Sequence, residues 1–189
     1  MSTIDQLVSD NEAYTSDFTH GDLPSPPGRR VAIVTCMDAR LDPARFLGLE
    51  EGHAHVIRNA GGCATEALRS LAVSQHLLGT NEIAVIRHTD CGMGKYSNEQ
   101  IAQKVAEASG GDPNGIDFLP FTDLEQAVRE DVDFLKGSDL IAADTAIRGF
   151  VYEVKTGRIE EVAEPTIKGA GPRTDYYERP HASTGDLVR

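Results

Sequence analysis

The sequence lacks tryptophan entirely and holds only three cysteines among its 189 residues. It also lacks any apolar run close to the roughly 18 residues that a membrane-spanning helix needs. Residues 1–10 show neither the basic nor the apolar region of a signal peptide. We therefore expect a cytoplasmic protein, in which three cysteines favour metal ligands, nucleophiles or core positions over a disulfide framework.

Basic residues are also in short supply, with 18 Lys and Arg against 30 Asp and Glu. The resulting formal net charge of −12 repels the phosphates of nucleic acids and the headgroups of anionic lipids. We therefore expect no nucleic-acid partner and no membrane partner. A simpler explanation of the charge is that an acidic, well-hydrated surface keeps a small protein soluble.

Apolar patterns of two kinds alternate along the middle of the chain. Continuous β-branched runs predict buried strands, and a period of 3.6 residues predicts helices. The expected elements are strands at 31–35, 55–57 and 83–86, helices at 64–78 and 122–137, and a strand, turn and returning strand over 147–162. The second helix opens with Thr122-x-x-Glu125, which is typical of a capping box. This order predicts an α/β fold with a mainly parallel sheet flanked by helices and an antiparallel C-terminal edge strand.

The two ends of the chain differ from this middle part. Residues 1–28 contain a helical stripe of Ile4, Leu7 and Val8, followed by a proline-rich connector, and we expect them to form an N-terminal helical arm. Residues 163–189 are rich in glycine and proline and poor in aliphatic side chains, so they form a tail without a core of its own. Residues 29–162 remain as the expected α/β domain, and it carries the candidate site residues described next.

Candidate metal ligands follow two of the predicted strands. Cys36 comes directly after the first strand, and the pair His88-x-x-Cys91 comes after the third. The carboxyl ends of parallel strands meet at one edge of a sheet, so these side chains can converge. Two thiolates and an imidazole suit Zn²⁺ and leave a fourth position open, as in catalytic zinc sites. The alternative is that the cysteines are buried apolar residues and the histidine is a hydrogen-bonded core residue.

Asp38 and Arg40 stand two residues apart in the turn after Cys36. A carboxylate beside an open zinc position can bind the metal or accept a proton from its water, and an arginine can hold that carboxylate away. The run Asn59, Ala60, Gly61 and Gly62 leads into a predicted helix, where free N–H groups suit a bound anion. A plain strand-to-helix turn that needs positive φ angles explains the same glycines equally well.

Taken together, these motifs resemble the β-class carbonic anhydrases. The resemblance runs from about residue 31 to 162 and is strongest with the short bacterial and archaeal branch. It is carried by the runs Cys-Met-Asp-Ala-Arg at 36–40, Arg-Asn-Ala-Gly-Gly at 58–62 and His-Thr-Asp-Cys-Gly-Met at 88–93. It implies a Zn²⁺ cofactor, hydration of carbon dioxide by zinc-bound hydroxide, and a homodimer or homotetramer with clefts at the subunit interface. It also implies a closed state in which Asp38 is a fourth zinc ligand.

Other functions remain open from the sequence. The same branch contains carbonyl sulfide and carbon disulfide hydrolases that use the same zinc site. A structural-zinc or redox-sensing protein would explain the cysteines but would leave Asp38 and Arg40 without a role. Some family members have a regulatory bicarbonate pocket built on a tryptophan, and the lack of tryptophan implies that this pocket is absent or rebuilt.

Two further kinds of role, for four residues, follow from residue type alone. Asp90 could orient the His88 ring or could simply be hydrated. Proton shuttles are possible at His53, His55 and His76, although structural roles are the usual case.

Overall fold

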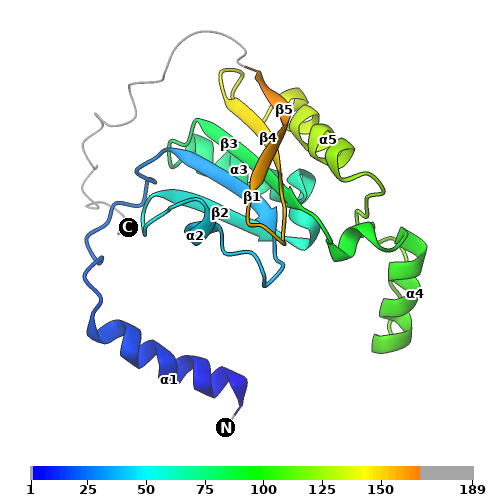
Figure 1. The fold of residues 1–189 in the computed structure, drawn as a ribbon, viewed down its shortest axis with the longest axis horizontal. Helices are drawn as coiled ribbons and strands as arrows, with labels where there is room; N and C mark the ends of the chain where they lie inside the picture. The colour runs from blue at the N-terminus through cyan, green and yellow to red at the C-terminus, as the bar shows by residue number, and fades with distance from the viewer. Residues whose placement is uncertain (1, 167–189) are drawn as a thin grey trace, which may run out of the picture.

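The computed structural model describes residues 2–166, with only the backbone described for 163–166. These residues form a five-stranded sheet with helices around it (Figure 1). The strands are β1 (Val31–Cys36), β2 (Ala54–Asn59), β3 (Glu82–His88), β4 (Ala146–Tyr152) and β5 (Ile159–Thr166), in the spatial order β2-β1-β3-β4-β5. The first four are parallel and β5 runs antiparallel to β4. The expected α/β sheet with an antiparallel edge strand is therefore confirmed. Residues 163–166 of the expected tail belong to β5, and the rest of the tail lies outside the described residues.

The helices cover the sheet unequally. They are α1 (Thr3–Ser16), α2 (Pro43–Phe46), α3 (Ala64–His76), α4 (Asn98–Ser109) and α5 (Leu124–Gly137), with short 3₁₀ turns η1 (Ala60–Gly62) and η2 (Gly92–Gly94). Alternate residues of β1 point to opposite faces, so Val34 packs in a core with α3 and α5 while Ile33 packs in a second core. The second core contains Phe46 of α2 and, at its end, Cys36 and Cys91. One apolar core thus ends at the expected metal site.

The starts of α3 and α5 differ from the expected caps. The capping-box prediction at Thr122 is wrong, because Asp123 is the N-cap and its side chain accepts the backbone N–H of Gln126 at 2.9 Å. Asp123 has extended backbone angles, so the helix begins one residue later than the pattern indicated. Helix α3 has no cap from its own N-cap side chain, and its Ala64 N–H instead donates to Asp131 of α5 at 3.0 Å. A distant side chain thus caps α3 and ties the two helices together.

Two helices extend away from the sheet (Figure 1). Helix α1 is the expected arm, and it buries none of its residues against the described part of the chain. Its apolar stripe is exposed, with Ile4 at 71%, Leu7 at 63% and Val8 at 65%. Helix α4, which the sequence analysis did not predict, also buries no residue within residues 2–166. No helix of this described part is long and apolar enough to cross a membrane.

Candidate metal centre

The strand ends bring the three expected ligands together. Cys36 ends β1 and His88 ends β3, and these strands are parallel neighbours. Cys91 follows on a tight turn that includes a left-handed residue, Asp90, with φ of 55°. All three are buried, with exposed fractions of 5%, 0% and 6% for Cys36, His88 and Cys91. Their donor atoms lie within 4.8 Å of one another, and the two sulfurs are 4.0 Å apart.

The His88 ring is oriented for a metal. Its Nδ1 lies 2.9 Å from the carbonyl oxygen of Thr89, which can only accept, so Nδ1 carries the proton. This leaves Nε2 as an unprotonated nitrogen, buried and without a hydrogen-bond partner in the part of the chain that the structure describes. A buried polar atom without a partner is unusual, and a metal ion beside the two sulfurs would satisfy it.

The paired thiols point to the same conclusion. The pKa of Cys36 is lowered to about 4, chiefly because the Cys91 thiol donates to its sulfur and in spite of burial. The backbone N–H groups of Asp38 and Gly61 add smaller contributions in the same direction. The ionised Cys36 in turn raises the pKa of Cys91. Two sulfurs this close cannot both ionise without a cation, so the set fits a divalent metal that prefers sulfur and nitrogen.

Arg40 holds Asp38 beside the metal position. The Asp38 carboxylate accepts hydrogen bonds from the backbone N–H, Nε and Nη2 of Arg40 at 2.9, 3.0 and 2.8 Å. These bonds hold the pKa of the Asp38 carboxyl well below its usual range, so it is ionised. Its Oδ2 is 3.8 Å from the free Nε2 of His88. The structure therefore places an ionised acceptor next to the three donor atoms.

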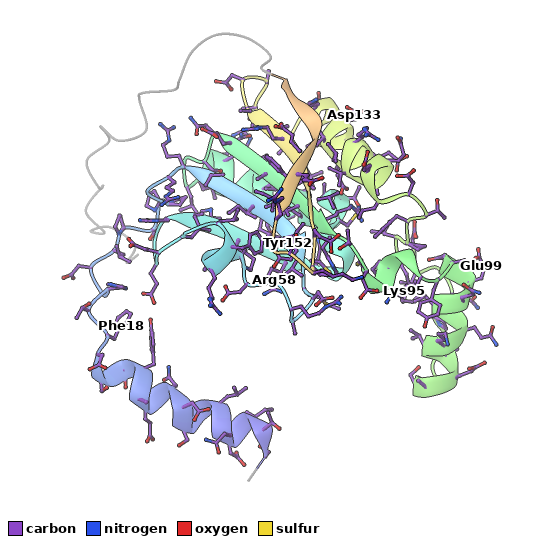
Figure 2. The ribbon with its side chains drawn as sticks, viewed as in Figure 1. Phe18, Arg58, Lys95, Glu99, Asp133 and Tyr152 are labelled. Carbon is purple, nitrogen blue, oxygen red and sulfur yellow. The ribbon has the colours of Figure 1, made fainter. Side chains whose placement is uncertain are left out.

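Arg58 fixes the turn that carries these residues. Its Nε donates to the carbonyl oxygen of Cys36 at 3.0 Å, and its Nη2 donates to that of Asp38 at 2.7 Å. From residue type alone, Arg58 at the start of the Arg-Asn-Ala-Gly-Gly motif could neutralise charge nearby or, as is usual, pair with a surface acid. In the structure it donates to these two backbone carbonyl oxygens. Figure 2 labels Arg58 near the carboxyl end of β2, where these contacts are made.

The glycine loop packs directly on the end of β1. Gly61 and Gly62 have φ of 77° and 71°, and a Cβ on Gly62 would lie 3.0 Å from the backbone nitrogen of Cys36. The Asn59 side chain closes the loop, since its Nδ2 and Oδ1 bind the backbone oxygen and nitrogen of Cys63 at 2.8 and 2.7 Å. The positive φ angles and the close approach together explain the glycines. Ala60 is the first residue of η1 in the same loop.

Asp90 does not orient the His88 ring, because the Thr89 carbonyl does. Its carboxylate binds Nη1 of Arg40 at 2.8 Å and Nζ of Lys95 at 2.6 Å.

The three shuttle candidates lie toward the opposite end of the strands. His55 pairs with Ala32, whereas Asn59 pairs with Cys36, so His55 is four residues, or about 13 Å, from the site along its strand. Its Nδ1 is 2.7 Å from the Ser74 hydroxyl. His53 lies 3.4 Å from Glu50, and His76 lies 2.9 Å from the Leu140 carbonyl oxygen. All three have structural contacts.

A buried ion pair supports the strand that carries His88. Arg87 and Asp131 are 4% and 5% exposed, and Nε of Arg87 donates to Asp131 Oδ2 at 2.7 Å. The guanidinium also lies 5.0 Å from the ring centroid of Phe121. Sequence reasoning missed this pair. Its one local signal is an aspartate on the apolar face of a helix, between Val128 and Leu135.

Comparisons with known proteins agree with this geometry. The family model described as "Carbonic anhydrase" matches residues 31–159. "Beta-carbonic anhydrase 1" of Mycobacterium tuberculosis is 42% identical over 165 residues, covering 86% of this chain and 99% of the relative. A "Carbon disulfide hydrolase" of an Acidianus species is 33% identical over 72% of this chain and 78% of the relative. The crystal structure of carbonic anhydrase from Streptococcus mutans superposes with a TM-score of 0.83 at 47% identity, covering 86% of this chain and 99% of that one.

Proposed function

The chain belongs to the β-carbonic anhydrase family, and on that premise we propose that it catalyses the reversible hydration of carbon dioxide to bicarbonate and a proton. The observation that carries the proposal is the buried set of Cys36, His88 and Cys91 beside an Asp38 that Arg40 keeps ionised. A structural metal site would have no use for that ion pair. The free thiols of the described cysteines also suit a reducing, cytoplasmic location.

We infer that the metal is Zn²⁺, because two sulfurs and one imidazole nitrogen are a typical zinc donor set. When bound, zinc supplies a Lewis acid that lowers the pKa of water toward neutrality. Cys36, His88 and Cys91 would hold the ion, and the Asp38 carboxylate would accept a hydrogen bond from the attacking water and so orient its lone pair. Arg40 keeps Asp38 ionised and turned to this task.

The glycine loop is the proposed anion site. The left-handed glycines turn the backbone of residues 59–62 onto the end of β1, beside Cys36. We propose that Asn59, Ala60, Gly61 and Gly62 stabilise the oxygens of bicarbonate as charge develops on them. The N–H of Gly61 also faces the Cys36 sulfur, which stabilises the thiolate.

Hydrolysis of carbon disulfide or carbonyl sulfide is the second candidate. It is favoured by the 33% identity to a protein named carbon disulfide hydrolase. Both substrates present a linear, electrophilic carbon to the same nucleophile, and pocket shape discriminates between such molecules by only about 1–3 kcal/mol. Sulfide release, measured against carbon dioxide hydration with one preparation, separates the two activities.

We further propose that the protein is a homodimer or homotetramer. Helices α1 and α4 bury no residue within residues 2–166, and the exposed stripe of Ile4, Leu7 and Val8 would otherwise remain in water. A second copy that covers this stripe removes apolar surface worth about 25 cal/mol per Å².

Stopped-flow carbon dioxide hydration with a pH indicator tests the proposed function. Wild-type protein should be active when loaded with zinc and inactive after the metal is removed. Cys36→Ser, His88→Ala and Cys91→Ser should each lose zinc by elemental analysis, because each removes one of three ligands. Cys63→Ser is the matched control, since Cys63 is a buried thiol outside the ligand set. Full zinc content in all three ligand variants, or zinc-loaded protein without hydration activity, would overturn the proposal.

A further inference from the structure

Arg40 lies between two aspartates rather than beside one. Its Nε and Nη2 donate to Asp38 at 3.0 and 2.8 Å. Its Nη1 donates to the Asp90 carboxylate at 2.8 Å, and Nη2 also donates to the Asp90 carbonyl oxygen at 3.1 Å. These bonds use four of the five N–H donors of a rigid, planar group. Arg40 therefore cannot turn away from Asp38 without also breaking its contacts with Asp90.

Asp90 is itself held in place for this contact. The φ of Asp90 is 55°, a left-handed conformation that is uncommon outside glycine but that aspartate and asparagine tolerate. In this conformation both the side chain and the carbonyl of Asp90 face Arg40. The second carboxylate oxygen, Oδ1, lies 2.6 Å from Nζ of Lys95, so each oxygen of Asp90 has its own cation. Lys95, which Figure 2 labels, directly follows η2, and Cys91 directly precedes it.

We propose that Asp90 is a positioning residue for the reaction: it fixes Arg40, and through Arg40 it keeps Asp38 from closing onto the metal position. The expected effect of Asp90 on catalysis rests on the proposed function, whereas its expected effect on zinc affinity concerns the metal site alone. Asp38 Oδ2 is already 3.8 Å from His88 Nε2, so a small movement would make it a competing ligand. Lys95 is a positioning residue as well, because it holds the Asp90 carboxylate that in turn holds Arg40.

The test uses zinc-loaded protein and Asp90→Asn. Asparagine keeps the size of the side chain and tolerates the left-handed backbone, so the loop should be retained. Asp38, less firmly restrained, should then bind zinc more often. We expect a zinc dissociation constant, measured by competition with a chelator, that is tighter by about two- to fivefold, as befits the loss of one exposed ion pair. The value of kcat should fall by a similar factor.

Two comparisons separate this effect from a general loosening of the loop. A purely structural role predicts weaker zinc binding in Asp90→Asn, which is the opposite sign. In an Asp38→Ala background the Asp90→Asn change should leave zinc affinity unaltered, because no carboxylate remains to close. Asp133→Asn, which removes the same charge from the exposed side of α5 (Figure 2), is the control.

Unchanged or weakened zinc affinity in Asp90→Asn, or the same gain with Asp38→Ala, would overturn the proposal. If Asp90→Asn does not fold, Lys95→Met tests the same chain of contacts with a smaller expected gain, and no gain there also overturns it. A wild-type protein without carbon dioxide hydration would remove the proposed function, but the zinc-affinity comparison would still decide the role of Asp90.

Discussion

Replacing Asp131 with alanine should destabilise the protein severely, because this carboxylate has two buried partners. One oxygen accepts Nε of Arg87, and the other accepts the N–H of Ala64 at the start of α3. The change leaves a guanidinium that is 4% exposed without its counter-ion, and its Nη1 already lacks a partner within the described residues. Breaking a buried pair by removing one member typically costs about 3–5 kcal/mol. That is a large part of the roughly 5–15 kcal/mol that stabilises an ordinary domain.

Urea denaturation followed by far-UV circular dichroism measures this loss. Zinc and protein concentrations must be the same for every variant, because metal binding and self-association both raise apparent stability. Asp133→Ala is the matched control on an exposed position of the same helix, and its effect should stay within about 0.5 kcal/mol.

The double variant Arg87→Met with Asp131→Leu completes the test. It removes both charges and fills the space with apolar atoms, so it should be clearly more stable than Asp131→Ala alone. An Asp131→Ala variant that loses less than about 1 kcal/mol would refute the reasoning. A double variant that is less stable than both Arg87→Met alone and Asp131→Leu alone would also refute the reasoning.

The remaining predictions concern the site and the arm. Asp38→Ala should keep zinc and lose about 10²-fold or more in kcat, since the orienting group goes while the ligands stay; Arg40→Ala should also lose activity, and wild-type rates from pH 7 to 9 would contradict its role. The pKa of Glu51 is lowered by a hydrogen bond from Tyr14 of α1 and by a contact with His20. This link between α1 and the loop before β2 therefore stabilises the fold above the usual glutamate pKa of about 4.3, and the stabilisation is lost as pH falls through the lower pKa of the folded state. A carbon-13 NMR titration should show the Glu51 midpoint rising in Tyr14→Phe, and equal midpoints would count against the contact. Light scattering should show an oligomer for the full chain and a smaller species when residues 1–20 are removed, whereas a full-length monomer at micromolar concentration with full activity would eliminate the interface.

The sequence by itself determined the order of the five strands, the arm helix α1 and helices α3 and α5, and it identified the candidate metal ligands, whereas α2 and α4 were not predicted. Continuous β-branched runs are local signals, and they correctly predicted β1 and β3 as buried parallel strands. Because the carboxyl ends of such strands meet at one edge, the positions of Cys36 and His88 in the sequence already indicated that they would converge. Asp38 and Arg40 follow in the same turn, two residues apart, so their ion pair could also be predicted from local sequence.

Only the tertiary structure decided which distant side chains support that site. Asp90 lies 50 residues from Arg40 and Asp131 lies 44 from Arg87, and no periodic pattern connects residues so far apart. Their contacts depend on how the loop after β3 turns and on how α5 packs against α3, which are set by packing of the whole core. The cap of α3 was hidden for the same reason, because a carboxylate from another helix provides it. A sequence encodes local geometry through propensity and period, whereas long-range pairs exist only once the chain has folded.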